Sequence, residues 1–443
     1  MAKPRRMFDH DLQTQPVEQR REEQQRRLQA LIARVQDASP QHRAQLGGID
    51  PQEVTLENLH EIPAVGKADL REHYPLGMLC VDRSMLRRIH ATSGTSGRPT
   101  IVAYTDGDLE VFGRTNARVL DAAGAGTGTM VHNAYGYGLF TGGLGLHQGI
   151  EHLGACTVPI SGGQTSRQVT LIRDLEPEVL LCTPSYAATI SDAMAAEGIA
   201  PEANSLKVGI FGAEPWSEGM RASLEKGLGI LARDIYGMCE LQGPGIAFEG
   251  RETPGHLFIN EDFFYPECID PATGEPVAEG EVGELVFTTL VKEAVPVVRY
   301  RTGDLASLQR IEDPEGRTLI TMSRVLGRSD DMLVIRGVNV FPSEIEAVLL
   351  GDDRVATAYT LVIDERGNRP SLIAVTEPTP QVASADVPAL LQDLEAQLKE
   401  RLGISCQVVL VEPGGLPRTE VGKAVRVQRW RAGEANPLPG VLS

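Results

Sequence analysis

The sequence predicts an α/β fold with two domains, and three successive patterns along the chain carry this prediction. From about residue 100 to residue 290, short apolar runs alternate with segments of helical periodicity, as in parallel sheets covered by helices. From residue 281, strand-like runs follow one another, which indicates an antiparallel or barrel-like segment. Beyond about residue 330 the pattern is that of a small α+β unit. We therefore expect a large N-terminal domain of several subdomains, with mixed and parallel sheets, over 1–329 and a smaller domain over 330–443.

Local periodicity predicts the individual elements. Residues 17–36 are predicted to form a charged amphipathic helix, because Leu28, Leu31, Ile32 and Val35 recur on one stripe. Strands are expected at 129–135, 155–161, 179–185, 207–214 and 230–237, with helices at 166–175, 185–198 and 216–229 between them. The strand-rich segment comprises 283–290, 297–309 and 318–328. The small domain is expected to hold strands within 357–377 and 406–417 and a helix at 387–403.

Composition limits the class of protein. The chain has 443 residues, of which 42% are apolar and 23% charged, as in an ordinary globular protein of two or three domains. Its formal net charge of −18 disfavours nucleic acid and anionic membranes as partners. The six cysteines form no C-x-x-C pair, and the N-terminus lacks the apolar core of a signal peptide. We expect a soluble, cytoplasmic protein that binds neither nucleic acid nor a membrane.

The stretch HATSGTSGRPT, residues 90–100, places glycines and hydroxyls between two ordered segments. Glycine lets the backbone approach a ligand closely, and hydroxyl and N–H groups donate to an anion. Pro99 stands where a Walker A loop needs Gly-Lys, and the β-branched run after it opposes the helix of a dinucleotide fingerprint. A phosphate-binding loop and a surface loop without function both remain open on these residues alone.

Four further motifs hold charged side chains in turns. Glu240, in YGMCELQGPG, has the oxygen ligands that Mg²⁺ prefers, and Asp304, in RYRTGDL, suits the two hydroxyls of a ribose. Arg328 and Asp330 lie at the predicted domain boundary in GRSDDMLVIRGVNVFP, and Lys423 lies in LPRTEVGKAVRV near the end of the chain. Each motif taken singly is equally well explained as a surface turn or linker.

Taken together and in this order, the motifs resemble the adenylate-forming superfamily of acyl-CoA synthetases, peptide-synthetase adenylation domains and luciferases. Within it the chain is most similar to the phenylacetate–CoA ligase family. The resemblance covers nearly the whole chain and rests on HATSGTSGRPT, HNAYGYGLFTGG, LCTPSY, KVGIFGAEPW, IYGMCELQGPGIAFE, VVRYRTGDL, GRSDDMLVIRGVNVFPSEIE and the terminal GKA.

The resemblance implies a role for each matching position. The loop that closes over the ATP phosphates would comprise Thr92, Ser93, Gly94, Thr95, Ser96 and Gly97. The adenine would be bound by Gly212, Ala213, Glu214, Pro215, Tyr236 and Gly237. Glu240 would bind Mg²⁺, Asp304 the ribose diol, and Arg328 the ribose or a phosphate. Lys423 would bridge the substrate carboxylate and the α-phosphate, Asp330 would be the hinge of a mobile C-terminal domain, and Gly337 would face coenzyme A.

The same resemblance implies ATP- and Mg²⁺-dependent adenylation of an aryl acid, followed by transfer of the acyl group to coenzyme A. Tyr135, Phe140, Ala213 and Pro244 would line the acid pocket, although core packing explains the aromatic residues equally well. Phenylacetate is the first expectation for the acid, and substituted benzoates are the alternatives. A carrier protein or an amine is the alternative acceptor, a non-catalytic adenylate-binding protein is a third reading, and a homodimer is a weaker expectation.

Three positions depart from the family pattern. Cys239 replaces the usual Thr or Ser before the glutamate, and Gly303 replaces an Arg that close relatives often carry. Gly250 replaces a cysteine that belongs to a structural zinc site in some relatives, so His256 and Cys268 remain as an incomplete set and we expect no zinc. These departures leave the identity of the acid open.

Overall fold

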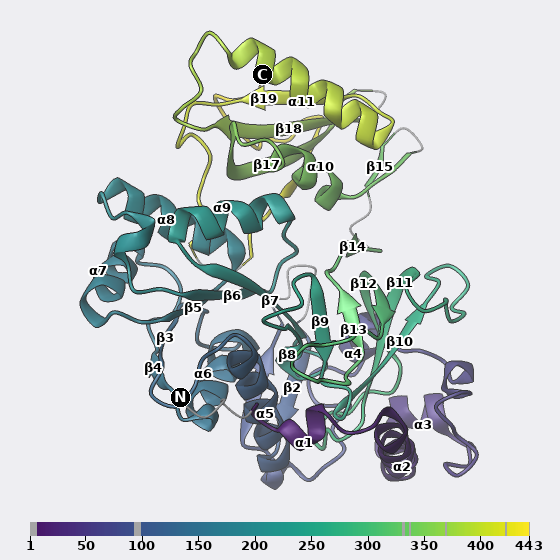
Figure 1. The fold of residues 1–443 in the computed structure, drawn as a ribbon. Helices are drawn as coiled ribbons and strands as arrows, with labels where there is room; N and C mark the ends of the chain where they lie inside the picture. Colours follow the sequence, from purple (N-terminus) through teal and green to yellow (C-terminus); the bar gives the residue numbers. More distant parts are fainter. Residues whose placement is uncertain are drawn as a thin grey trace.

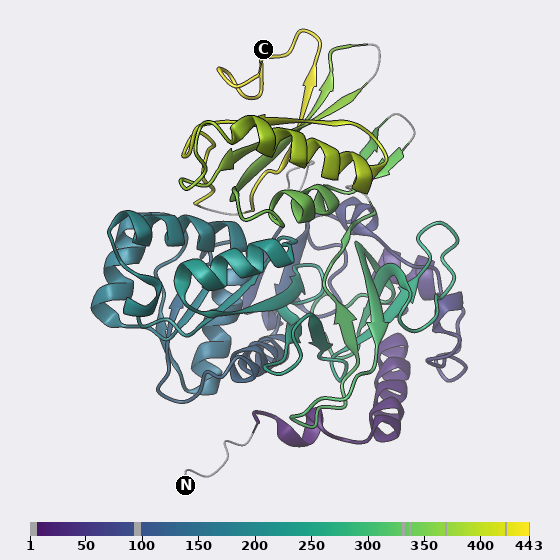
Figure 2. The same ribbon diagram turned by 45° about the horizontal axis from the view of Figure 1, so that its top comes forward.

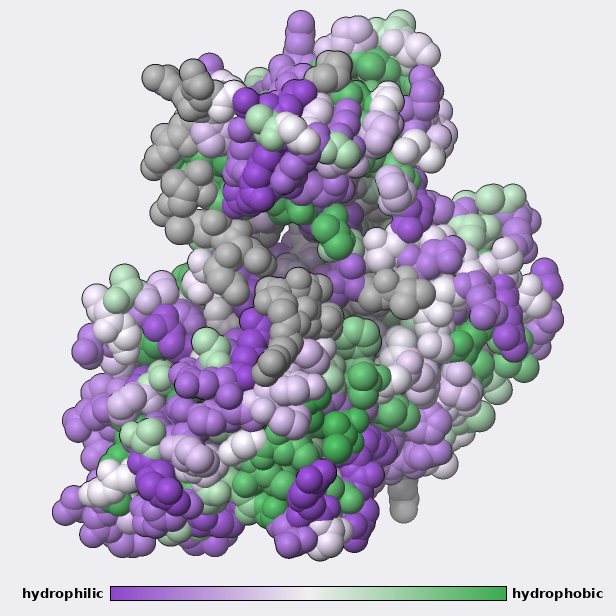
Figure 3. All heavy atoms as spheres, turned by 180° about the vertical axis from the view of Figure 1, so that it is seen from behind, coloured by the Kyte–Doolittle hydropathy of each residue, from purple (hydrophilic) through white to green (hydrophobic). Residues whose placement is uncertain are grey.

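A computed structural model describes residues 7–92, 99–329, 333–335, 338–367, 370–420 and 423–442. A large body carries a small C-terminal domain at one end, above helices α8 (Pro184–Ala196) and α9 (Glu218–Leu228) in Figure 1 and again in the tilted view of Figure 2. From behind, the surface is hollowed between the small domain and the large body (Figure 3). The predicted fold class, a large α/β body with a separate small α+β domain, is confirmed.

The chain begins with helices at one end of the large body. These are α1 (His10–Gln13), α2 (Val17–Val35), α3 (Pro40–Leu46) and α4 (Lys67–Glu72), with short 3₁₀ turns at Leu59–Glu61 and Arg83–Met85. Leu28, Leu31, Ile32 and Val35 are all at most 2% exposed, so the stripe predicted for α2 is its buried face. This face packs against Leu46, Leu59 and Val298 in one apolar cluster.

Strands β1 (Arg88–Ala91) and β2 (Ile101–Tyr104) form an antiparallel hairpin that flanks the predicted phosphate loop. Thr92 is the described end of this loop: its N–H donates to the Thr100 carbonyl at 3.0 Å, and its hydroxyl accepts from the Thr100 N–H at 3.0 Å. The loop therefore starts from two strands that are hydrogen-bonded up to its base.

A parallel sheet follows, as the alternating pattern predicts. Its strands are β3 (Met130–Asn133), β4 (Cys156–Val158), β5 (Val179–Cys182), β6 (Val208–Gly212) and β7 (Leu231–Met238), in the spatial order β4-β3-β5-β6-β7. The helices are α5 (Asp106–Ala122), α6 (Thr141–Leu153), α7 (Thr165–Leu175), α8 (Pro184–Ala196) and α9 (Glu218–Leu228), with a 3₁₀ turn at Pro201–Ala203. Helices α8 and α9 lie between the sheet and the small domain, and α5 and α6 lie on the other side (Figure 1).

The sheet becomes antiparallel at β8, earlier than the sequence pattern indicates. We expected the antiparallel run from residue 281, but β7 already pairs antiparallel with β8 (Gly243–Glu249). The physical reason is the short connection 239–242, because only antiparallel neighbours can be joined by a tight turn. The remaining strands are β9 (His256–Ile259), β10 (Phe264–Ile269), β11 (Val282–Thr289), β12 (Tyr300–Gln309), β13 (Thr321–Ser323) and β14 (Gly327–Arg328), which complete a 12-stranded sheet.

The small domain has its own four-stranded sheet in the order β19-β18-β17-β20. The elements are the hairpin β15 (Leu333–Ile335) and β16 (Val338–Val340), helix α10 (Pro342–Leu349), strands β17 (Val355–Glu365) and β18 (Ser371–Pro378), helix α11 (Val387–Leu402), and strands β19 (Cys406–Leu410) and β20 (Val427–Arg431). The helix predicted at 387–403 is confirmed. One apolar cluster crosses the domain junction, with Trp216 and Met220 of the large body and Leu349 and Leu350 of the small domain among its members.

Candidate active site

Tyr236, Asp304 and Arg328 form a hydrogen-bonded network where β7, β12 and β14 come together. The Tyr236 hydroxyl donates to Oδ2 of Asp304 at 2.7 Å, and Nη1 of Arg328 donates to Oδ1 at 2.7 Å. Strand register accounts for the second contact, since Asp304 lies opposite Arg328 in the β12–β14 pair. Tyr236 is 7% exposed and Asp304 is 6% exposed. The structure thus brings together residues from three separate sequence motifs.

Electrostatics places Glu240 in the same neighbourhood. Burial raises the pKa of the Tyr300 hydroxyl well above its ordinary value, and the charges of Glu240, Arg328 and Asp304 also act on this group. Burial and the neighbouring Asp304 carboxylate likewise raise the pKa of Tyr236, so its hydroxyl keeps its proton and remains a donor at neutral pH.

Glu240 lies in the turn between β7 and β8, and two buried side chains hold that turn by its backbone. Nζ of Lys292 donates to the Leu241 carbonyl at 2.6 Å, and the Tyr104 hydroxyl donates to the Gln242 carbonyl at 2.7 Å. Glu240 is 4% exposed, and no described residue donates a hydrogen bond to its carboxylate. A carboxylate whose oxygens are left for a ligand fits Mg²⁺ bound together with phosphate oxygens.

Lys292 was not singled out by the sequence analysis. Burial lowers the pKa of Lys292 to about 8, although the charges of Asp108, Cys239 and Glu240 partly oppose this shift. Its ammonium also lies 5.0 Å from the centre of the Tyr104 ring. The available signal was a lysine inside the apolar run FTTLVKEAVPVV, since a buried charge in such a run needs a partner.

The turn after β6 reaches across to the small domain. Ala213 has a φ of 72°, a left-handed conformation that L-residues seldom adopt, and the next side chain, Glu214, is half-buried. Oε1 of Glu214 accepts from the Ser185 N–H at 2.9 Å, and Oε2 accepts from the Ala424 N–H at 2.9 Å. One carboxylate therefore joins strand β6, helix α8 and the segment that carries Lys423.

Lys423 is exposed, and its charge reaches the turn that holds Glu240. Burial raises the pKa of the Cys239 thiol, and the Lys423 charge is among the groups that oppose this rise. The Cys239 sulfur lies 3.1 Å from the Thr141 hydroxyl oxygen. Because burial keeps the thiol protonated, we read Cys239 as a small packed residue rather than as a nucleophile.

Gly237 and Pro244 lie opposite each other in the β7–β8 pair. A Cβ at Gly237 would come within 2.2 Å of the Gly243 carbonyl oxygen, so this position accepts only glycine without a backbone shift. Gly212 is constrained in a similar way, since its Cβ would lie 2.2 Å from the Ile235 carbonyl oxygen. Pro215 is exposed at the end of the same turn.

The two aromatic residues assigned to the acid pocket differ in environment. Tyr135 is 7% exposed and packs in an apolar cluster with Val131, Leu146 and Ile150, so core packing is part of its role. Its buried hydroxyl has no hydrogen-bond partner among the described residues, and burial raises its pKa. Phe140 is 49% exposed at the start of α6. Contact of either ring with a substrate stays a prediction.

Seven predicted site residues lie outside the described residues, namely Ser93, Gly94, Thr95, Ser96, Gly97, Asp330 and Gly337. Their roles rest on the resemblance alone.

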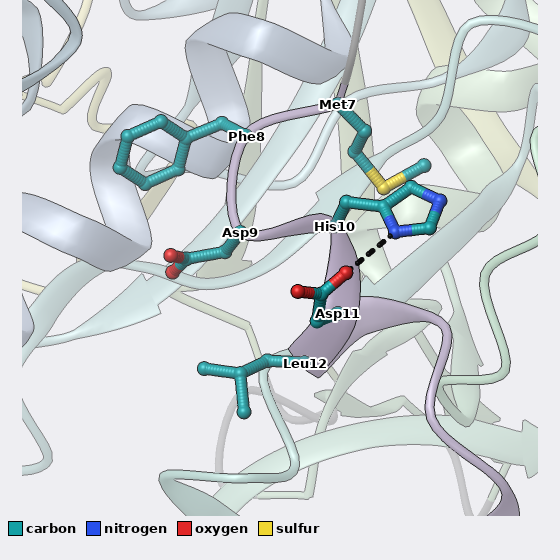
Figure 4. Close-up of a pocket in the computed structure, with 6 residues that line it drawn as sticks. All are labelled: Met7, Phe8, Asp9, His10, Asp11 and Leu12. Carbon is teal, nitrogen blue, oxygen red and sulfur yellow. Dashed lines mark hydrogen bonds and ion pairs between the residues drawn. The ribbon is translucent and has the colours of Figure 1, made fainter.

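Other features of the described residues lie apart from this site. Met7 to Leu12 line a cavity of about 500 Å³ at the N-terminal segment, where His10 Nδ1 and Asp11 Oδ1 are 3.1 Å apart (Figure 4). Among the described residues, no group of three His, Cys, Asp or Glu side chains is arranged to hold a metal. His256, which belongs to the incomplete zinc set named above, has its Nδ1 3.2 Å from the Gln309 side chain. No described helix has the length and apolar character needed to cross a bilayer.

Comparison with known proteins places this geometry in a family. The family model for AMP-binding enzymes matches residues 7–289, and the model for the C-terminal domain of AMP-binding enzymes matches residues 337–431. A phenylacetate-coenzyme A ligase of Thermus thermophilus is 47% identical over 95% of this chain and 99% of its own length. A phenylacetate-coenzyme A ligase of Escherichia coli is 43% identical over 94% of this chain and 96% of its own length.

Solved structures agree on the fold, and they differ in how closely their domain arrangement matches this one. A crystal structure of 2-hydroxyisobutyryl-CoA ligase in the postadenylation state, 28% identical, matches with a TM-score of 0.90 over 97% of this chain and 93% of that chain. The same ligase in its thioesterification state matches with a TM-score of 0.70 over 95% of this chain and 92% of that chain. From these matches and the extent of the sequence identity, the chain belongs to the AMP-binding enzymes and, within them, to the phenylacetate–CoA ligase family.

Proposed function

We propose that the protein is an AMP-forming acid–CoA ligase that adenylates an aryl carboxylic acid with ATP and then transfers the acyl group to coenzyme A. The observation that carries the proposal is geometric: Tyr236 and Arg328 orient the Asp304 carboxylate, and Glu214 of the large body binds the N–H next to Lys423 in the small domain. Identity of 43–47% to phenylacetate-coenzyme A ligases over nearly the whole chain supports it.

In the first half-reaction the substrate carboxylate attacks the α-phosphorus of ATP and pyrophosphate leaves, which gives acyl-AMP. Asp304, oriented by Tyr236 and Arg328, accepts hydrogen bonds from the ribose hydroxyls. Lys423 stabilises the negative charge that builds up as two anions approach each other. Glu240 would hold Mg²⁺, which supplies further charge neutralisation at the phosphates. The residues of the loop at 92–97 would enclose the departing pyrophosphate.

In the second half-reaction the coenzyme A thiol attacks the acyl carbonyl and AMP leaves. The domain arrangement resembles the postadenylation form of 2-hydroxyisobutyryl-CoA ligase more closely than its thioesterification form. We therefore propose that the small domain, taken as residues 330–443, turns about Asp330 between the two steps. This rotation withdraws Lys423 and brings the strand near Gly337 to the coenzyme A site.

Phenylacetate is the first candidate acid, because the similar curated proteins are named for it. Substituted benzoates are the alternative, since Tyr135 and Phe140, if they line the acid pocket, would offer aromatic faces to any flat aryl acid. The test is pyrophosphate release over a panel of aryl and aliphatic acids, with and without coenzyme A. Sustained release with phenylacetate only when coenzyme A is present supports the proposal.

The same assay distinguishes the alternatives. A single burst that coenzyme A cannot sustain would instead support a carrier protein or an amine as the acceptor. Failure of every acid to give a burst would contradict adenylation and support a non-catalytic adenylate-binding protein.

We further propose a cytoplasmic location, which the six free cysteines favour, and a homodimer, which sedimentation would test.

A further inference from the structure

We propose that the Glu214 side chain is the positioning residue of Lys423: it holds the lysine segment on the large domain for adenylation and is dispensable for thioester formation. The proposal rests on the proposed function, since Glu214 acts only through Lys423. It gives Glu214 a role different from the adenine contact that the family resemblance implies.

The geometry joins two distant parts of the chain through one carboxylate. Oε2 of Glu214 accepts the N–H of Ala424 at 2.9 Å, although the two residues are 210 positions apart. Ala424 follows Lys423 directly, so this hydrogen bond fixes the backbone beside the lysine and leaves the ammonium free. No described carboxylate forms an ion pair with Lys423.

The other oxygen of Glu214 is held independently of the small domain. Oε1 accepts the N–H of Ser185 at 2.9 Å in the first turn of α8, a helix that spans Pro184–Ala196. A helix N-terminus has free N–H groups and a positive end of its dipole, which favour a carboxylate. The carboxylate is therefore already oriented when the Lys423 segment arrives.

Other contacts between the segment around Lys423 and the large body are more exposed than the hydrogen bond between Glu214 and Ala424. Arg418 Nε lies 3.4 Å from Asp192 Oδ2, with these side chains 28% and 58% exposed, and the Thr165 hydroxyl donates to Glu420 Oε1 at 2.9 Å at the surface. Exposed ion pairs contribute little because water and salt screen them. The half-buried Glu214 contact is thus the one best placed to determine where Lys423 lies.

The contact also belongs to one domain arrangement. The structure that contains this hydrogen bond matches the postadenylation form of 2-hydroxyisobutyryl-CoA ligase with a TM-score of 0.90. It matches the thioesterification form of the same ligase with a TM-score of 0.70. If the small domain turns for the second step, the bond between Glu214 and Ala424 breaks. Removing it should then slow only the step in which Lys423 acts.

The test uses Glu214→Gln in the full-length protein, because glutamine keeps the shape but offers one acceptor oxygen instead of two. Three quantities are measured with the acid that the wild type turns over fastest: acid-dependent pyrophosphate release in a single turnover, thioester formation from supplied acyl-AMP and coenzyme A, and the Kd for AMP. We expect pyrophosphate release to fall about tenfold to a hundredfold, as for loss of a hydrogen bond to a charged group. Thioester formation and the Kd for AMP should stay within about twofold.

Thr165→Val is the matched control, because it removes another contact of the same segment to the large domain without touching Ala424. An equal loss of adenylation in Thr165→Val would assign the effect to domain docking in general and overturn the specific role of Glu214. A parallel loss of AMP affinity and thioester formation in Glu214→Gln would make it an adenine contact instead. Unchanged pyrophosphate release would also contradict the proposal.

Lys423→Ala separates this proposal from the function it rests on. If Lys423→Ala adenylates at the wild-type rate, the assignment of the catalytic lysine is wrong whatever Glu214 does. If it loses adenylation, Glu214→Gln added to it should cause no further loss, since a residue that acts only through Lys423 has nothing left to position. A further drop in the double variant would overturn the proposal.

Discussion

The Tyr236 hydroxyl donates a hydrogen bond of 2.7 Å to Asp304, across 68 residues of sequence, and so connects strand β7 with strand β12. Arg328 donates to the other oxygen of the same carboxylate. Both Asp304 oxygens are thereby oriented in a nearly buried site, which is the preorganisation that binding of a diol requires. If Asp304 binds the ribose as proposed, this contact gives the Tyr236 hydroxyl a part in nucleotide binding as well.

Tyr236→Phe should therefore weaken ATP binding. The substitution leaves Oδ2 of Asp304 without this donor at a site where Asp304 is 6% exposed. We expect the KM for ATP to rise about tenfold, since loss of a hydrogen bond to a charged group costs about 1.5–3 kcal/mol. Tyr265→Phe is the control, because its hydroxyl is a long 3.5 Å from the Leu56 carbonyl. An unchanged KM in Tyr236→Phe would contradict a role of Asp304 in binding the ribose.

Lys423→Ala should abolish adenylation and spare the second step. Loss of a preorganised charge at a developing anion typically costs about 10²–10³ in rate. Pyrophosphate release measures the first half-reaction, and thioester formation from supplied acyl-AMP measures the second. Wild-type pyrophosphate release in this variant would show that Lys423 is not the catalytic cation.

Asp330→Pro should have the opposite effect on the two steps. If Asp330 is the hinge, a proline with a fixed φ angle restricts the rotation that thioester formation needs. We expect acyl-AMP to form and to accumulate without turnover to the thioester, as measured by quenched-flow analysis of bound products. Equal loss of both half-reactions would argue against the hinge.

Gly219→Ala should obstruct this domain arrangement without harming the fold of the large body. A Cβ at Gly219, in the first turn of α9, would lie 2.0 Å from the Leu350 carbonyl oxygen of the small domain. Alanine favours a helix over glycine by about 1 kcal/mol, so the thermal stability of the large body should not fall. We expect adenylation to slow while thioester formation from acyl-AMP persists.

Gly227→Ala is the control for this experiment, because it lies in the same helix and its Cβ would meet only the Ser191 side chain. If Gly219→Ala adenylates as fast as Gly227→Ala, close docking of α9 against Leu350 is not needed for the first step.

Asp234 should make stability depend on pH. Burial, and to a smaller extent the nearby Glu249 carboxylate, raise the pKa of Asp234 from 3.8 to about 7. Trp216, Arg221 and Arg324 lower this pKa and so partly oppose the rise. Between pH 4 and pH 7 the native state thus keeps a proton that the unfolded state has lost. The free energy of unfolding therefore falls as pH rises through this window, by up to about 4 kcal/mol from this group.

Asp234→Asn cannot titrate, so its stability relative to wild type should rise between pH 4 and pH 7, as measured by urea unfolding at several pH values. Asp270→Asn should show no trend between pH 4 and pH 7, because hydrogen bonds from the backbone of Thr273 and Ala272 lower the pKa of Asp270 below its ordinary 3.8 and keep it ionised throughout this window. A pH-independent difference between wild type and Asp234→Asn would refute the raised pKa.

Much of the architecture follows from local sequence. The stripe of α2, the parallel strands from β3 to β7 and helix α11 were predictable, because side-chain periodicity and β-branched composition express the backbone preference of each segment. The start of the antiparallel run at β8 was not. It depends on the length of the turn at 239–242: the motif YGMCELQGPG predicts a turn, but it does not predict that only four residues connect the two strands and so make them antiparallel neighbours.

The sequence by itself determined the family and which residues are the candidates for its chemistry: Lys423, Glu240, Asp304 and the glycine-rich loop stand in recognisable motifs because each motif is local. Only the tertiary structure decided what holds them in place. Lys292 donates a hydrogen bond to the backbone of the turn that carries Glu240, and Glu214 accepts one from the N–H of Ala424. Both contacts join segments that are remote in sequence. Local patterns cannot reveal such pairs, because they arise only when folding brings distant segments together, and burial then requires each polar group to find a partner.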